Sequence, residues 1–256
     1  MSRTLTALLA IVCCTGCATR LNEAGEAGGE PRMPLSFQRL ALDPANGGRQ
    51  VQAEALQPGD ILLTAVDAIT STGIRMLTLA PVSHAAIYLG ERQVVEAVGS
   101  GVRIRALDDV LADESVVVAF RHPKITALQG EKIRAFSNAS VGGGYNHVGI
   151  VLQAPFSIER RMCELPLVPE SIRDFCIRGV ASIQLGASRN DQFFCSQFVL
   201  EAYRQAGLPI TDADPRMISP ADILHMREGD VSSVRIHQPL TYVGHLKYRI
   251  LAASSE

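Results

Sequence analysis

The sequence predicts a single α+β domain in which a small antiparallel sheet packs on helices. Residues 82–98 read as two alternating strands around a turn, and residues 195–206 carry the clearest helical stripe in the chain. At 256 residues, the chain is long enough for one well-buried domain and short for two. Its net charge of -2 provides no long-range field for nucleic acid, so we expect no such partner.

The predicted elements follow from turn residues and periodicity along the chain. The last helix should begin with Asn190 or Asp191 as its cap and stop at Gly207. The predicted elements are strands at 61–63, 82–89, 93–98, 101–105 and 116–121, and helices at 67–79, 107–111, 125–139 and about 190–206.

The first residues have the pattern of an export signal. A basic start at Arg3 precedes an apolar run from Leu5 to Cys14, which is too short to span a bilayer. Small residues then lead to Cys17, as in bacterial lipoprotein signals. We therefore predict a signal peptide over residues 1–16, lipidation of Cys17 and a periplasm-facing envelope lipoprotein. Ala18, which follows that cysteine, resembles the outer-membrane sorting pattern.

Two alternatives exist for this region. One is ordinary signal-peptidase cleavage near Ala18, without acylation. The other is a metal site formed by Cys13, Cys14 and Cys17, but no histidine or further cysteine follows at finger spacing. The rest of the chain contains no metal-type cluster either, so we predict neither a metal nor another cofactor.

The remaining chain divides into a tether and a folded domain. Residues 17–50 are rich in Gly, Ala, Glu and Pro and predict a lipidated, flexible tether, whereas residues 51–256 form the domain. Residues 153–190 contain three prolines and read as an irregular insertion or lid. Cys163 and Cys176 lie close together there and could form a disulfide, which an oxidising compartment permits.

His84 and Glu96 fall on neighbouring strands of the predicted hairpin. With a three-residue loop at 90–92, Ala86 falls opposite Glu96, and His84 is then a diagonal neighbour of Glu96 on the same face. A two-residue loop would place the two side chains on opposite faces. Glu96 stands inside an apolar strand, where a buried carboxylate is costly unless paired, and His84 is its nearest candidate partner.

Cys195 is the cysteine that a Cys163–Cys176 pair would leave free; the alternative is that Cys195 itself pairs with Cys163 or Cys176. It lies in the first turn or so of the last helix. A thiol there feels the positive end of the helix dipole, which favours the reactive thiolate. A free cysteine on an apolar stripe is more often a small core residue, and the helix alone favours that interpretation. The presence of His84 and Glu96 reverses the balance toward a nucleophilic triad.

The other histidines rank lower as candidate bases. His147 is the main rival, but no carboxylate-bearing strand follows it. The remaining histidines lie at a strand end or in a C-terminal region without matching acids, and we interpret them as surface or structural residues: His122, His225, His237 and His245.

Five segments together resemble the NlpC-type, papain-like cysteine hydrolases. The resemblance is to the circularly permuted branch that includes YiiX-like proteins and is related to lecithin–retinol acyltransferases. It spans roughly residues 55–210. The matching segments are Pro58–Leu63, Ser83–Gly90, Val94–Ala97, Gly144–Asn146 and Phe194–Val199 with the helix that follows.

This resemblance implies a fold and a role for each site residue. The fold is a papain-like one, with a cysteine at a helix start packed against a small antiparallel, barrel-like sheet, and with the histidine before the cysteine in the chain. The resemblance makes Cys195 the nucleophile, His84 the base and acid, and Glu96 the orienting residue. It also implies that Tyr145 lends its hydroxyl to the oxyanion or the substrate.

We therefore expect an envelope cysteine hydrolase that cleaves an amide or ester bond through a thioester on Cys195. The substrate would be a cell-wall peptide from peptidoglycan, or a lipid or acyl amide, and the lipid anchor would hold the enzyme on the membrane. The alternative is a non-catalytic envelope lipoprotein that keeps the fold and binds a lipid or a peptide.

Overall fold

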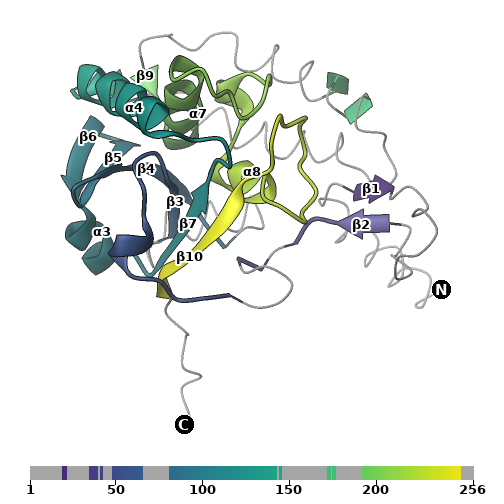
Figure 1. Cartoon of the computed structure of the whole chain (residues 1–256). Coiled ribbons are helices and arrows are strands. Elements are labelled where there is room, and N and C mark those ends of the chain that lie inside the picture. The colour runs from purple at the N-terminus through teal and green to yellow at the C-terminus, as the bar shows by residue number, and fades with distance from the viewer. Residues whose placement is uncertain are drawn as a thin grey trace, which may run out of the picture.

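The structure is a computed structural model, shown in Figure 1. It describes residues 19–21, 35–39, 41–42, 48–65, 81–142, 144–145, 172–173, 175–176 and 192–248. The predicted helix at 67–79, most of the predicted insertion, and Cys17, Cys163 and His147 lie outside these ranges.

The described strands are short, and most of them follow one another closely in the chain. They are β1 (Thr19–Leu21), β2 (Leu35–Phe37), β3 (Ile61–Ala65), β4 (His84–Gly90), β5 (Gln93–Val98), β6 (Gly101–Ala106), β7 (Val116–Arg121), β8 (Gly144–Tyr145), β9 (Gln192–Phe193) and β10 (Thr241–Tyr248). The helices are α3 (Leu107–Asp113), α4 (Ala127–Ser140), α7 (Cys195–Gln205) and α8 (Pro220–His225), with 3-10 turns η1 (Ala53–Ala55) and η2 (Pro215–Met217).

Six strands form one antiparallel sheet in the order β10-β7-β3-β4-β5-β6. The stretch from β3 to β6 is a meander, and β7 returns to the free edge of β3. In Figure 1, α4 and α7 lie over one side of this sheet and α3 lies at the other. The prediction of an α+β domain with an antiparallel sheet is confirmed.

The alternation of side chains along β4 divides the core into two clusters, because successive side chains point to opposite faces of a strand. Ala85 and Ile87 pack in the cluster that contains Phe198 and Tyr203 of α7. On the other face, Ala86 packs in the cluster that contains buried side chains of α3. The helical stripe predicted for α7 is confirmed as the surface that faces the sheet.

The segment Pro58-Gly59-Asp60 is a fixed turn that joins α7 to the sheet. Gly59 has a φ of 94°, in the left-handed region that favours glycine, and a Cβ there would lie 2.1 Å from Ile125 Cδ1, which would have to move. The hydroxyl of Tyr203 donates to the Gly59 carbonyl oxygen. Asp60 is fully buried and accepts two hydrogen bonds of 2.7 Å from Arg121.

The described residues between 17 and 50 are held on the domain, which differs from the flexible tether expected there. Arg227 donates to the carbonyl oxygens of Arg39 and Leu42 at 2.9 and 2.8 Å, and the Arg39 amide donates to Asp230 at 3.0 Å. Composition gave no sign of these contacts, because their partners lie almost two hundred residues further along the chain. The C-terminal elements α8 and β10, which lie on either side of Arg227 and Asp230 in the chain, were not predicted either.

Candidate active site

The β4–β5 hairpin places His84 beside Glu96. Residue Ala86 pairs with Glu96 in the register of the two strands, as predicted. His84 Nε2 lies 2.9 Å from Glu96 Oε2, and Glu96 is only 3% exposed. The predicted side-by-side arrangement of an imidazole and a buried carboxylate is therefore present.

The loop that produces this register differs from the expected one. Gly90 pairs with Gln93, so the loop contains only Glu91 and Arg92, both with positive φ (52° and 56°), as in tight hairpin turns. A two-residue loop would have put His84 and Glu96 on opposite faces. A bulge between Tyr88 and Gly90 adds one residue to β4 and restores the predicted pairing.

Two arginines that sequence reasoning missed complete the environment of Glu96. Arg103 is its cross-strand partner on β6, and its Nε and Nη2 lie 2.9 and 2.7 Å from Glu96 Oε1. Arg105 Nη1 lies 3.5 Å from the same oxygen. A signal was available, because a two-residue turn at 99–100 would have placed Arg103 opposite Glu96.

Cys195 is the first residue of α7, and Phe194 is the N-cap without a side-chain cap. The prediction that the helix begins near Asn190 or Asp191 was wrong, since Gln192 and Phe193 form the strand β9 and keep the chain extended up to Phe194. The sulfur therefore lies at the end of α7 where a helix leaves its first N–H groups without intrahelical partners. Gly207, with a φ of 78°, follows the end of the helix as predicted.

The thiol of Cys195 interacts directly with His84. The two side chains share a hydrogen bond, and backbone groups of Ala85 and Ser196 also hydrogen-bond to the sulfur. Because His84 Nε2 is engaged by Glu96, its Nδ1 is the ring nitrogen left to face the sulfur. Cys195, His84 and Glu96 thus form one hydrogen-bonded row, in which Cys195 is 8% exposed.

The charges within this row favour a thiolate–imidazolium pair. Burial acts to raise the pKa of Cys195, but the charge and hydrogen bond of His84, together with the backbone hydrogen bonds, lower it below its ordinary value. Burial acts to lower the pKa of His84, yet the charge and hydrogen bond of Cys195, followed by those of Glu96, raise it. A thiolate is the form of cysteine that attacks carbonyl groups.

Glu96 stays ionised throughout this arrangement. Burial acts to raise its pKa, but the hydrogen bond and charge of His84, and then those of Arg103, lower it to about 2. A permanently charged carboxylate on Nε2 fixes the orientation of the imidazole and stabilises its protonated form.

Glu114 is a second acid that sequence reasoning missed, and the charge of His84 affects its pKa. Glu114 follows α3 and is 8% exposed. Burial raises its pKa, and the positive charge of His84 only partly offsets this effect. The sequence offered no pattern that joins Glu114 to the hairpin, because the two meet only through the β3–β7 side of the sheet.

Tyr145 is brought close to Cys195 by backbone pairing. It belongs to β8, which pairs in parallel with β9, and Tyr145 is the register partner of Phe193. Phe193 lies two residues before Cys195, so the fifty residues between Tyr145 and the nucleophile do not separate them in space. The Tyr145 side chain lies outside what the structure describes, and its role stays a prediction.

The structure also shows the bonding state of two cysteines and the acidic partners of two C-terminal histidines. Cys195 is a free cysteine, whereas Cys176 is in a disulfide. The prediction that the C-terminal histidines lack matching acids was wrong: His225 Nδ1 lies 3.1 Å from Asp230, and His237 Nε2 lies 3.0 Å from Asp212. These pairs form because the chain turns back on itself between residues 212 and 237. Neither pair includes a thiol.

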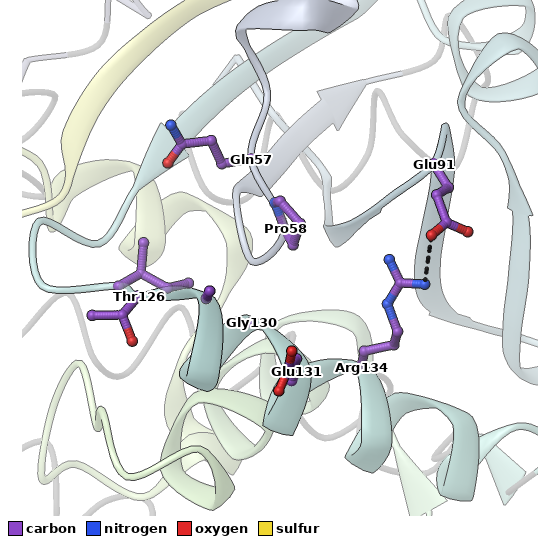
Figure 2. A pocket seen from close by; sticks show the side chains of 9 residues that line it. Gln57, Pro58, Glu91, Thr126, Gly130, Glu131 and Arg134 are labelled. Atoms are coloured by element: carbon purple, nitrogen blue, oxygen red, sulfur yellow. Dashed lines mark ion pairs between the residues drawn. The ribbon is translucent and has the colours of Figure 1, made fainter.

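A cavity of about 580 Å³ lies at the far end of β4 from His84. Figure 2 shows it between the Pro58 turn and α4, with Arg134 reaching toward Glu91 at 3.6 Å. Its lining residues are Gln57, Pro58, Glu91, Ile125, Thr126, Ala127, Gly130, Glu131 and Arg134. No member of the Cys195 row lines this cavity, so the cavity belongs to a different part of the molecule.

The described residues hold neither a metal-type cluster nor a helix that could span a membrane. Among them, no three His, Cys, Asp or Glu side chains are grouped as ligands of a metal ion. In the same part of the chain, no helix has the length and apolar character needed to cross a bilayer.

Comparisons with known proteins place the chain in a family. No family model matches it. Among solved structures, the metalloprotein YiiX of Escherichia coli O157:H7 aligns with a TM-score of 0.40 and 19% identity, over 61% of this chain and 69% of that one. The probable lipoprotein peptidase YaeF of Escherichia coli K12 is 42% identical over 216 residues, which cover 83% of this chain and 79% of that protein. With identity and coverage at that level, the chain belongs to the family of the probable lipoprotein peptidase YaeF.

Proposed function

We propose that this protein is a cysteine hydrolase of the bacterial envelope that cleaves an amide or ester bond through a thioester on Cys195. The observation that carries the proposal is the row of Cys195, His84 and Glu96, in which the sulfur and the imidazole stabilise each other's charged forms. A structural cysteine in a core needs no such charged partner.

Acylation follows from the charges in the row. The Cys195 thiolate attacks the carbonyl carbon of the substrate, and the carbonyl oxygen becomes an oxyanion. The first backbone N–H groups of α7 have no intrahelical partners, and we propose that they stabilise this charge as it develops. When the intermediate collapses, the C–N or C–O bond breaks, and the imidazolium of His84 gives its proton to the leaving amine or alcohol.

Deacylation uses the same groups in the reverse order. His84, now neutral, takes a proton from a water molecule, and the resulting hydroxide attacks the thioester carbon. Collapse releases the carboxylic acid and returns the thiolate–imidazolium pair. Glu96 holds the ring in place through both steps. Tyr145 would supply an additional hydroxyl donor to the oxyanion.

The name of the relative favours a peptide amide as the bond that is cleaved, because YaeF is described as a peptidase. Cell-wall peptides are the corresponding substrates in the envelope, and lipids or acyl amides are the second class that the resemblance to permuted NlpC-type proteins implies. The same relative is described as a lipoprotein, which supports acylation at Cys17. A periplasm-facing position on the outer membrane is part of the proposal.

The test compares the full-length protein with its Cys195→Ala variant on two substrate panels, peptidoglycan fragments and phospholipids with acyl amides. We expect product release, and a Cys195-linked acyl adduct in quenched samples, only with the wild-type protein. His237→Ala is the matched control, because it removes a histidine that also pairs with a carboxylate but lies away from the thiol.

Each outcome has a defined meaning. Turnover that persists in Cys195→Ala would rule out the thioester route. If neither panel is turned over and a small electrophile such as iodoacetamide does not label Cys195, the non-catalytic binding lipoprotein is the correct interpretation.

A further inference from the structure

The chain is fixed to the domain at Thr19, at its first described residue. Thr19 is 5% exposed and pairs with Phe37 in the β1–β2 register. The buried side chain of Arg173 donates to the Thr19 carbonyl oxygen at 3.1 Å and also to the carbonyl oxygens of Ser233 and Ser232, at 3.1 and 3.2 Å. A backbone carbonyl held by a buried guanidinium is a firm attachment point.

This attachment lies very close to the predicted lipid anchor. Cys17 precedes Thr19 by two residues, and two residues of extended chain span at most about 7 Å. Whatever conformation Ala18 adopts, the backbone of Cys17 therefore lies within that distance of Thr19, and acyl chains on its side chain would begin close to the folded domain. Such a short connection does not allow the domain to stand away from the bilayer.

Exposed apolar side chains occur at the same place. Phe37, the register partner of Thr19, is 49% exposed. Ile172 and Phe175 flank Arg173, and they are 58% and 81% exposed. Figure 1 shows the short green segments at 172–176 on the same side of the molecule as β1 and β2, and the contact of Arg173 with Thr19 joins them. We call Phe37, Ile172 and Phe175 the anchor face.

We propose that the anchor face rests on the phospholipid bilayer that carries the acyl chains of Cys17, so that the domain is held in one orientation on the membrane. This inference rests on the proposed lipidation. Exposed apolar groups on a soluble domain indicate an interaction surface, and aromatic side chains favour the boundary between headgroups and acyl chains. Acyl chains bring this surface to the bilayer, and burial of its side chains adds a second contact that fixes the rotation.

The chain offers a direct spectroscopic test, because it contains no tryptophan. The variants Phe37→Trp and Phe175→Trp place a single indole on the anchor face. Leu128→Trp is the matched control, since Leu128 is 57% exposed but belongs to α4. Each full-length, lipidated protein is reconstituted into phosphatidylcholine vesicles with plain or brominated acyl chains. We expect Phe37→Trp and Phe175→Trp to lose most of their emission in brominated vesicles and to shift to shorter wavelength, with Leu128→Trp unchanged.

Sedimentation with the vesicles separates the two possible failures. A protein that sediments but shows equal emission for all three variants in both lipids would overturn the inference and leave the anchor intact. A protein that does not sediment contradicts the lipidation of Cys17 and the inference with it. Emission changes that appear without vesicles and depend on protein concentration would assign the anchor face to contact with a second copy. Alkylation of Cys195 is measured in the same samples. It shows, independently of membrane contact, whether the domain is folded and its thiol reactive.

Arg173→Ala provides a test of the attachment itself. Without the guanidinium, Thr19 is no longer tied to the segment that carries Ile172 and Phe175, so the Phe175→Trp signal should lose its quenching in brominated vesicles while sedimentation is retained. Persistent quenching in this variant would show that Arg173 does not orient the domain. Cys195 alkylation again reports whether the variant has kept its fold.

Discussion

Arg103 lies directly opposite Glu96 in the β5–β6 pair and binds one carboxylate oxygen, Oε1, while the other oxygen is left for His84. This division of the two oxygens explains how a carboxylate that is 3% exposed remains charged in the middle of a sheet. A buried charge is tolerated when its hydrogen-bonding capacity is filled. The same arrangement gives the imidazole a fixed anionic neighbour.

Removal of Arg103 alone should have a small effect on the nucleophile. Arg103 is 49% exposed, and exposed ion pairs contribute up to about 1 kcal/mol, so Arg103→Gln should slow Cys195 alkylation at neutral pH by less than about fivefold. In the double variant Arg103→Gln with Arg105→Gln, alkylation of Cys195 should slow by more than the product of the two single-variant factors. The reason is that Oε1 then loses both of its arginine partners. If the factors of the two single variants simply multiply in the double variant, the two arginines do not act through one shared oxygen. Alkylation kinetics with iodoacetamide provide the measurement.

His84→Ala should return Cys195 to the behaviour of an ordinary or even less acidic thiol. The lowered pKa of Cys195 means that reactivity is present above that pKa and is lost as the pH falls through it. Without His84, burial dominates, and at pH 6.5 an unperturbed thiol is only about 1% ionised, so alkylation should slow by about ten- to a hundredfold. His237→Ala should match the wild type. Identical pH profiles in all three proteins would contradict the ion pair.

The Glu96 carboxylate should contribute a pH-dependent part of the stability. Its pKa is lowered from 4.5 to about 2 on folding, so its contribution is complete above 4.5 and is lost as the pH falls toward 2. The difference in free energy of unfolding between wild type and Glu96→Gln should therefore shrink over that interval. Urea unfolding at several pH values measures it. A difference that is constant from pH 7 to pH 2.5 would disagree with an ionised, paired Glu96.

Two Asp–Arg pairs that differ in burial should differ strongly in their effect on stability. Asp60→Ala removes two hydrogen bonds between charged groups and should lower the free energy of unfolding by about 1 to 3 kcal/mol. Asp108→Ala, which removes an exposed pair with Arg92, should leave the free energy of unfolding nearly unchanged. Denaturant unfolding of both variants decides this, and equal losses would show that burial does not set the strength of these pairs.

Tyr145→Phe should separate turnover from nucleophile reactivity. If the hydroxyl stabilises the oxyanion, its loss should lower kcat by about a hundredfold, the usual effect of removing one such donor. Alkylation of Cys195 should remain unchanged, because that reaction forms no oxyanion. A parallel fall in both rates would assign Tyr145 to the support of the local fold instead.

The sequence by itself determined the hairpin, the helical stripe and the three residues of the row. These features are local, because strand alternation and helical spacing are set by neighbours along the chain, and an acid within an apolar strand signals a partner on the adjacent strand. The pairing of Ala86 with Glu96 could be predicted for this reason. The orientation of Cys195 toward the domain followed from the stripe of α7.

Only the tertiary structure decided how these parts meet. The bulge after Tyr88 corrected a hairpin loop that was one residue shorter than expected, and no local pattern specifies such an insertion. The start of α7 was set by β9, which depends on pairing with the distant β8. The attachment of Thr19 likewise requires Arg173, a partner 154 residues away. Contacts between distant residues form because the whole core brings them together, and local sequence patterns do not contain that information.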